Sequence, residues 1–222
     1  MKKNYIVLPI FNDWKSLEKV LIILNKSFKN TKSSNHVVIV NDCSFNNLQK
    51  NKYKNFDNFK SLKLINLKKN VGSQKAIFFG LKYLQKKITK KTDQIIISIL
   101  DSDGEDNPKK LKELIHLANQ KKDYVIFASR KERTESIFFR LLNYFRLFIT
   151  FILTGKFINF GNFSSFSSSI LKKILINDNL YLAYSSGVLK NYNKIYLHDV
   201  KKTKKILWKF ESEFYIFIRA FN

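Results

Sequence analysis

Short apolar, β-branched segments alternate with amphipathic helical segments through the first two-thirds of the chain, and this alternation constrains the fold more than any other feature. The strand-like segments are residues 5–10, 36–40, 62–67, 94–100 and 124–128. A helix over residues 14–28 is predicted by apolar side chains at helical spacing, namely Leu17, Val20, Leu21, Leu24 and Phe28. Such alternation is typical of βαβ units, so we expect an α/β fold with a doubly wound, mostly parallel sheet flanked by helices.

Two further helix starts and a change of pattern complete this outline. One helix is predicted to begin near Gly72, and Asn107 followed by Pro108 is a typical start of another. After Arg133 we expect a long apolar helix over residues 135–154 that ends at Gly155, and then extended segments over residues 157–168. Residues 194–200 are expected to form an edge strand.

The length and composition favour one globular domain with an appendage. The chain has 222 residues, 45% of them hydrophobic and 26% charged, so we assign residues 1–200 to one α/β domain. Residues 201–222 combine a basic run with a broad apolar stripe, which predicts an amphipathic helix. Such a helix suits a membrane interface, and packing on its own domain or on a partner is an equal alternative.

The strongly basic charge leaves two explanations open. Forty-one Lys and Arg against 17 Asp and Glu give a net charge of +24. A field of this sign favours polyanions such as nucleic acid, acidic lipid headgroups or phosphorylated substrates, but genomic bias toward lysine explains it equally well. The basic residues are spread along the chain and no nucleic-acid-binding motif is present, so we expect no nucleic-acid partner.

The sequence indicates a cytoplasmic protein without a membrane span. The apolar stretch near Met1 is too short for a secretory signal, and residues 137–153 are interrupted by Arg140, Asn143 and Arg146. Cys43 is the single cysteine, which excludes an internal disulfide and a thiolate zinc cluster.

Polar residues gather where the predicted strands end. These segments are residues 11–13, 41–46, 70–74, 101–106 and 129–133. In open α/β sheets, ligands bind beyond the carboxyl ends of the strands. The sequence therefore predicts a binding site at that edge of the sheet.

The acidic loop after the fourth strand is the sharpest of these segments. Asp101 and Asp103 are separated by one residue and directly follow a buried strand, so both carboxylates can reach one hard cation. Mg²⁺ or Mn²⁺ held there would neutralise a leaving nucleoside diphosphate. A calcium loop fits less well, because Lys112 stands where an EF-hand requires glutamate, and a solvated turn with a helix cap is the remaining alternative.

Two other segments carry weaker signals. Asp42 ends the second strand, where its carboxylate can accept hydrogen bonds from a base or a ribose. Residues 70–75 open a helix, where backbone N–H groups and Lys75 can face an anion. The chain has no G-x-G-x-x-G motif, so a nicotinamide or flavin Rossmann site has little support.

Together these segments resemble glycosyltransferase family 2. Residues 8–13 (LPIFND) resemble the opening strand of that family, and residues 40–44 (VNDCS) its DDGS element. Residues 70–76 (NVGSQKA) look like its N-x-G-x-x-x-A helix start. Residues 101–108 (DSDGEDNP) are similar to the DADLQDPP loop of the polyprenyl-phosphate branch, related to dolichyl-phosphate mannose synthase. Residues 129–133 (SRKER) match its R-x-x-R segment, and residues 161–164 (GNFS) lie where it has GDFRL.

The resemblance implies a GT-A-like fold and a role for each matched residue. Pro9, Phe11 and Asp13 would frame the base of a UDP- or GDP-type donor, and Asp42 would bind its polar edge or the ribose. Gly72 and Lys75 would contact the donor at the helix start. Asp101 would lie against the nucleotide, and Asp101, Asp103 and Glu105 would hold Mg²⁺ or Mn²⁺. Asp103, Arg130 and Arg133 would be catalytic, with the arginines binding phosphates bidentately.

Three departures from the family pattern bear on specificity. Asn41 replaces the first acid of DDGS, Cys43 replaces its glycine, and Asn162 replaces the aspartate of GDFRL. The chain also ends before the membrane helices that many relatives carry. We therefore expect a peripheral protein on the cytoplasmic face of the membrane, with a membrane-protein partner or a homo-oligomer left open.

Three hypotheses about function follow. The first is metal-dependent, inverting transfer of a sugar from a nucleotide-sugar to a polyprenyl phosphate, whose ionised phosphate needs no strong base. The second keeps the fold but transfers the sugar to a hydroxyl of a glycan or lipid-linked sugar, with Asp106 as the base. The third is a basic module without enzymatic activity that binds polyanions or membranes in a salt-dependent way.

Overall fold

The computed structural model describes residues 2–45, 56–88, 95–129, 160–177 and 179–200. The predicted helices at residues 135–154 and 201–222, and the helix end at Gly155, lie outside the described residues. The assignment of residues 1–200 and 201–222 to separate units therefore stays a prediction.

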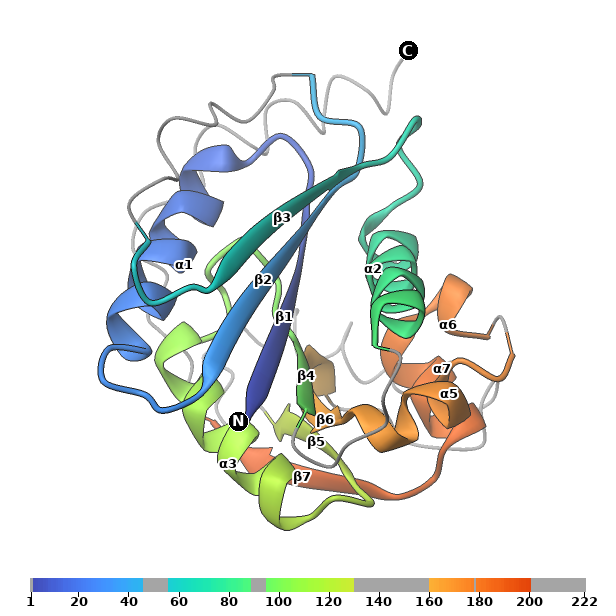
Figure 1. Ribbon diagram of the computed structural model, residues 1–222. Coiled ribbons are helices and arrows are strands. Elements are labelled where there is room, and N and C mark those ends of the chain that lie inside the picture. Colours follow the sequence, from blue (N-terminus) through green and yellow to red (C-terminus); the bar gives the residue numbers. More distant parts are fainter. Residues whose placement is uncertain (1, 46–55, 89–94, 130–159, 178, 201–222) are drawn as a thin grey trace, which may run out of the picture.

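A seven-stranded sheet with the strand order β3-β2-β1-β4-β6-β5-β7 forms the centre of the fold (Figure 1). The strands are β1 (Lys3–Ile10), β2 (Ser34–Asn41), β3 (Ser61–Asn66), β4 (Ile95–Ile99), β5 (Val125–Ser129), β6 (Phe160–Ser167) and β7 (Ile195–Asp199). All five strands predicted for the first two-thirds of the chain are present. The edge strand predicted at residues 194–200 is confirmed as β7, which pairs with β5 at one end of the sheet.

The sheet is mixed, although most of its strand pairs are parallel. β1 pairs in parallel with β2 and β4, β2 with β3, and β5 with β7. β6 lies between β4 and β5 and is antiparallel to both. The extended segment predicted at residues 157–168 thus contains an internal strand, and it reverses the direction of the sheet at one position.

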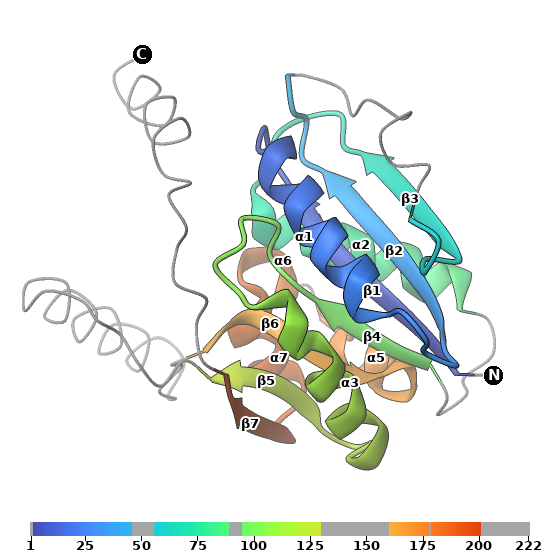
Figure 2. The same cartoon turned by 90° about the vertical axis from the view of Figure 1, so that its left-hand side faces the viewer.

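Helices cover both faces of the sheet. The longer ones are α1 (Trp14–Ser27), α2 (Ser73–Lys87) and α3 (Leu111–Gln120), and α3 is preceded by the 3-10 turn η2 (Pro108–Lys110). The chain between β6 and β7 adds η3 (Ser168–Ile170), α5 (Leu171–Ile174), α6 (Asn179–Leu182) and α7 (Tyr184–Asn191). α1 and α3 lie on one face and α2 with α5–α7 on the other, as the two perpendicular views agree (Figure 2).

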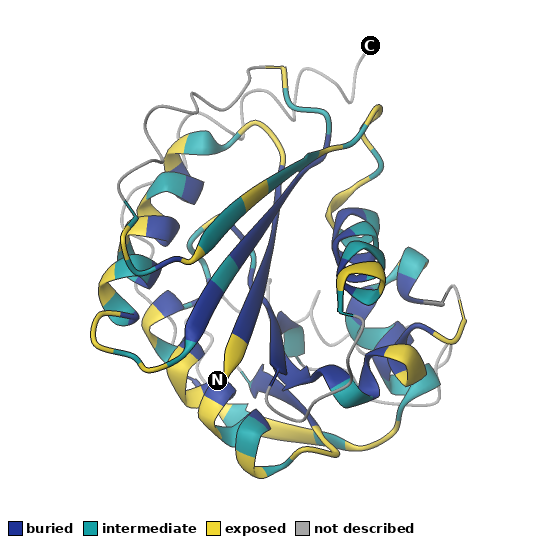
Figure 3. Cartoon of the chain, viewed as in Figure 1, coloured by how far each residue is buried: buried dark blue, intermediate teal, exposed yellow. Residues whose placement is uncertain are grey.

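The two helical layers create two apolar cores. Ile6 and Leu8 of β1 pack in the core under α1 and α3, whereas Tyr5 and Val7 pack in the core under α2. β1 is therefore buried on both faces, as the dark strands of Figure 3 show. Burial on both faces explains why β1 reads as a continuous apolar run instead of an alternating one. None of the described helices is both long and apolar enough to cross a membrane.

Gly80 sets the distance between α2 and the sheet. A Cβ atom at this position would lie 2.7 Å from Cγ1 of Val7 and 3.0 Å from Cγ2 of Val40, so no larger residue fits without a shift of backbone or side chains. This close approach brings the start of α2 next to the carboxyl ends of β1 and β2. The helix that begins at Ser73 is thereby placed at the edge of the sheet where these strands end.

Candidate active site

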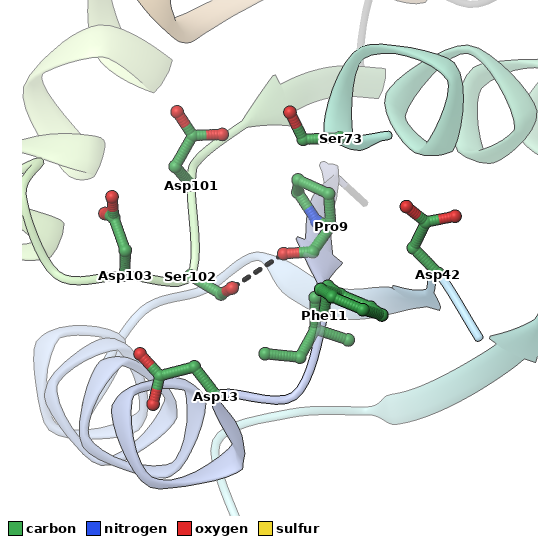
Figure 4. A pocket seen from close by; sticks show the side chains of 9 residues that line it. Pro9, Phe11, Asp13, Asp42, Ser73, Asp101, Ser102 and Asp103 are labelled. Atoms are coloured by element: carbon green, nitrogen blue, oxygen red, sulfur yellow. Dashed lines mark hydrogen bonds between the residues drawn. The ribbon is translucent and has the colours of Figure 1, made fainter. Parts of the chain in front are cut away.

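An open pocket of about 250 Å³ lies at the carboxyl ends of β1, β2 and β4 (Figure 4). The side chains around it come from the end of β1 and the β1–α1 loop, the residue after β2, the start of α2 and the acidic loop after β4. The lining residues are Pro9, Ile10, Phe11, Asp13, Asp42, Ser73, Asp101, Ser102 and Asp103. The predicted edge of the sheet therefore carries a pocket, and four of its lining residues are aspartates.

The β1–α1 loop forms one wall of the pocket. Phe11 is 38% exposed, and its ring lies 6.2 Å from that of Phe45, centroid to centroid. Asp13 caps α1, because its Oδ1 accepts a hydrogen bond from the backbone N–H of Ser16 at 3.1 Å. This bond orients the Asp13 carboxylate at the pocket.

Asp42 joins the end of β2 to the start of α2. Its Oδ1 accepts a hydrogen bond from the N–H of Val71 and its Oδ2 one from the N–H of Gly72, both at 2.8 Å. The residue is only 2% exposed, yet it lines the pocket. Because a carboxylate oxygen has two lone pairs, each oxygen can accept one further bond from a ligand.

The loop after β2 is braced against the β1–α1 loop. Oδ1 of Asn41 accepts from the N–H of Ser44 at 3.0 Å, and Oγ of Ser44 accepts from the N–H of Asn12 at 2.8 Å. Cys43 between them has a φ of 61°. This left-handed conformation costs a non-glycine residue roughly 1–2 kcal/mol, so the chain keeps a backbone shape that the glycine of DDGS adopts freely.

The acidic loop after β4 is tied to β1 and shaped by its own side chains. The hydroxyl of Ser102 donates to the carbonyl of Pro9 at 2.6 Å, and Oδ1 of Asp103 accepts from the N–H of Glu105 at 2.9 Å. The amide Nδ2 of Asn162 lies 3.2 Å from both carboxylate oxygens of Asp101. Neutral donors thus orient Asp101 and Asp103 at the pocket.

Six of the predicted site residues come together around the pocket, namely Pro9, Phe11, Asp13, Asp42, Asp101 and Asp103. Gly72, Lys75 and Glu105 do not line it. Gly72 supports it through Asp42, and Nζ of Lys75 lies over the ring of Tyr181, 4.6 Å from the centroid. Arg130 and Arg133 lie outside the described residues.

Sequence reasoning missed several residues that build the site. Ser73 and Ser102 line the pocket, and Asn162 holds Asp101 from β6. The position of Ser102 between two aspartates of the predicted metal loop gave a usable signal for Ser102. The GDFRL-like segment singled out Asn162 as a departure that bears on specificity, but no local pattern predicts its contact with Asp101, since the two residues are 61 positions apart in the chain.

The pocket fits a divalent cation that is shared with a ligand. Within the described residues there is no group of three or more His, Cys, Asp or Glu side chains that could hold a metal alone. Asp101 and Asp103 both line the pocket, however. Mg²⁺ is commonly held by one or two carboxylates together with substrate phosphates and water, so two aspartates form a sufficient protein contribution.

The strand order and the acidic pocket define an α/β domain of the GT-A type. The chain belongs to glycosyl transferase family 2, whose sequence profile matches residues 5–177. A search of curated protein sequences found no significant match.

Solved structures share this fold at low sequence identity. Residues 1–349 of S. aureus TarS in complex with UDP are 19% identical, with a TM-score of 0.58 over 90% of this chain and 60% of that one. M. tuberculosis glucosyl-3-phosphoglycerate synthase in complex with Mn²⁺, UDP and glucosyl-3-phosphoglycerate is 10% identical, with a TM-score of 0.55 over 92% of this chain and 72% of that one. The match to the longer TarS structure covers only 36% of that chain. Likeness at these identities shows the shared fold.

Proposed function

We propose that this protein transfers a sugar from a UDP- or GDP-type nucleotide-sugar donor with the help of Mg²⁺ or Mn²⁺. The observation that carries the proposal is the gathering of Asp13, Asp42, Asp101 and Asp103 around one pocket in a chain with a net charge of +24. Four carboxylates in one pocket repel one another unless hydrogen bonds or a cation offset the repulsion. Membership of the glycosyltransferase family supplies the reaction class.

Each side of the pocket suits a different part of the donor. Phe11 presents an exposed ring on which a base can stack, and Asp42 is held rigidly enough to bond a base N–H or a ribose hydroxyl. Ser73 at the start of α2 suits an anionic group, because backbone N–H groups of a helix start favour negative charge. Asp101 and Asp103 lie across the pocket from Asp42 (Figure 4), and the diphosphate and its cation would meet on their side.

A divalent ion held by Asp103, with Asp101 and Glu105 as further candidate ligands, would neutralise charge on the departing nucleoside diphosphate. The protein residues position the donor so that an acceptor oxygen attacks its anomeric carbon on the face opposite the diphosphate. The bond from this carbon to the acceptor oxygen forms as the bond to the diphosphate oxygen breaks, which inverts the configuration. Most of the rate enhancement would come from positioning and charge stabilisation.

We further propose a polyprenyl phosphate as the acceptor, used at the cytoplasmic face of a membrane. Its ionised phosphate is already a nucleophile, so no strong protein base is required. Support comes from the resemblance of residues 101–108 and 129–133 to the polyprenyl-phosphate branch. Arg130 and Arg133 are the proposed phosphate ligands, and residues 201–222 are the proposed contact with the membrane or with a membrane-protein partner.

Calorimetric titration of UDP and of GDP, each with and without Mn²⁺, tests the donor site. We expect one nucleotide to bind at least tenfold more tightly when Mn²⁺ is present. Comparable weak binding of both nucleotides, unchanged by the metal, would reject the proposed site.

A second experiment separates the two acceptor classes. One radiolabelled donor is offered with a polyprenyl phosphate and, in parallel, with glycan or lipid-linked hydroxyl acceptors. We expect transfer to the phosphate. Transfer to hydroxyls alone would favour the alternative in which a carboxylate base is needed, although Asp106 is only 6% exposed and does not line the pocket.

A further inference from the structure

A series of hydrogen bonds leads from Asp101 in the pocket lining into the buried interior at Ser164. Both carboxylate oxygens of Asp101 lie 3.2 Å from Nδ2 of Asn162. Asn162 belongs to β6, which is paired with β4 directly before the acidic loop. An aspartate at position 162 would place two carboxylates at this distance, whereas the amide supplies a donor to Asp101 without a second negative charge.

The series continues through Ser164 to Tyr184. The hydroxyl of Ser164 donates to the backbone carbonyl of Asn162 at 2.9 Å and lies 2.8 Å from the hydroxyl of Tyr184. Ser164 has a single hydrogen to donate, so the Tyr184 hydroxyl must be the donor in the second bond. Burial raises the pKa of Tyr184 far above its ordinary value, which keeps the phenol protonated and able to donate.

Tyr184 also connects this series of hydrogen bonds to the start of α2, on the opposite side of the pocket. The backbone N–H of Tyr184 donates to Oε1 of Gln74 at 2.7 Å. Gln74 is the second residue of α2, next to Ser73 in the pocket wall and two positions after Gly72, which holds Asp42. Hydrogen bonds and the first turn of α2 therefore connect the two carboxylates that face each other across the pocket, Asp42 and Asp101.

We propose that Ser164 and Tyr184 are positioning residues that fix Asp101 relative to Asp42 before the donor binds. Neither touches the pocket, and both are 0% exposed. The ring of Tyr184 packs against that of Phe127 with centroids 5.9 Å apart, which limits its rotation. A site held within a fraction of an ångström by buried partners loses less entropy on binding, so this series of bonds contributes to donor affinity. The inference rests on the proposed function.

Two neighbouring serines of β6 give a matched test. Ser164 and Ser165 are both 0% exposed, and successive strand residues point to opposite faces of the sheet. The hydroxyl of Ser165 lies 2.8 Å from that of Ser98, on the face away from Tyr184. Ser164→Ala and Ser165→Ala each remove one buried hydroxyl, but only the first interrupts the series to Asp101.

The measurement is the Kd of whichever of UDP or GDP the unaltered protein binds, in Mn²⁺, together with the melting temperature of each variant. Loss of one buried hydrogen bond predicts that Ser164→Ala and Tyr184→Phe each raise the Kd by about three- to tenfold. Ser165→Ala should lower the melting temperature as much as Ser164→Ala and leave the Kd within about twofold. Equal Kd values for the two serine variants would overturn the inference.

A double-mutant cycle tests whether the effect passes through Asn162. If Tyr184 acts on Asp101 through Asn162, Tyr184→Phe should no longer raise the Kd once Asn162→Ala is present. Additive effects of the two substitutions would overturn the proposed route. If the unaltered protein binds neither nucleotide, the proposed function itself fails. That result differs from one in which the unaltered protein binds a nucleotide and all variants have the same Kd, which would overturn only the inference.

Discussion

Each aspartate at the pocket is oriented by a backbone or side-chain amide. Asp13, Asp42 and Asp103 accept from backbone N–H groups, and Asp101 from the side chain of Asn162. Such bonds hold each carboxylate in a fixed orientation at the pocket. The pocket is therefore built to keep negative charge in place, which suits a cation and a diphosphate that arrive together.

Asp103 gives the sharpest test at the residue scale. Asp103→Asn keeps the shape of the side chain, and the amide oxygen can still accept the N–H of Glu105, but the charge that would hold the cation is lost. We expect nucleotide affinity in Mn²⁺ to fall at least about tenfold, because hard cations prefer carboxylate ligands. Affinity without metal should not fall, because the substitution removes one carboxylate that repels the diphosphate. Both values come from calorimetry.

Asp123→Asn is the control for this substitution, because Asp123 is an exposed aspartate between α3 and β5, outside the pocket lining. It removes the same charge from the chain. A control that weakened metal-dependent binding as much as Asp103→Asn would show that net charge alone matters, and the assignment of Asp103 would be wrong.

The residues of the site could be predicted from sequence only where they follow a strand directly. Asp42 and Asp101 each follow a buried apolar strand, so their place at the edge of the sheet follows from topology alone. Lys75 was assigned from the predicted helix start and Glu105 from its motif position, but side-chain direction decides what they contact. Nζ of Lys75 lies over the ring of Tyr181, and a turn stabilised by Asp103 sets the backbone at Glu105.

At the scale of elements, apolar periodicity predicts the long helices and fails for the short ones. α1 and α2 have 14 and 15 residues, enough for an apolar stripe to repeat. α5 and α6 have four residues each, about one turn. An apolar repeat cannot be detected over a single turn, so these helices were not predicted. The antiparallel direction of β6 was also missed, because strand direction depends on pairing and leaves no mark in the local sequence.

Gly80→Ala tests how α2 is fitted to the sheet. Alanine favours a helix by up to about 1 kcal/mol over glycine, but forcing a methyl group into a packed core costs about 1–3 kcal/mol. A Cβ atom 2.7 Å from Val7 makes the steric cost dominant. We expect a lower melting temperature and a weaker nucleotide affinity, since a shift of α2 disturbs the bonds between its start and Asp42.

Lys86→Ala on the same helix is the matched control. Lys86 is exposed, so its replacement should change the free energy of unfolding by no more than about 0.5 kcal/mol. If Gly80→Ala were as stable as this control, the close packing of α2 on β1 and β2 would be contradicted.

At the scale of the whole molecule, the charge of the pocket is opposite in sign to the net charge of the chain. The chain carries a net charge of +24, yet four aspartates line one pocket. A basic surface raises the local concentration of any anion, whereas an acidic pocket repels a diphosphate that lacks a cation. Non-specific attraction and specific binding should therefore respond differently to salt.

Ionic strength separates these two modes. Between about 0.05 and about 0.5 M sodium chloride the Debye length falls severalfold, so the affinity for heparin should fall steeply. Nucleotide affinity in Mn²⁺ should fall by less than about fivefold over the same range, because a cation bridging carboxylates and phosphates at contact distance is screened far less than separated surface charges. Fluorescence titrations of both ligands on the same protein give the two slopes. Parallel slopes would mean that lysines on the surface hold the nucleotide, and a basic polyanion-binding module would then describe the protein better than an enzyme.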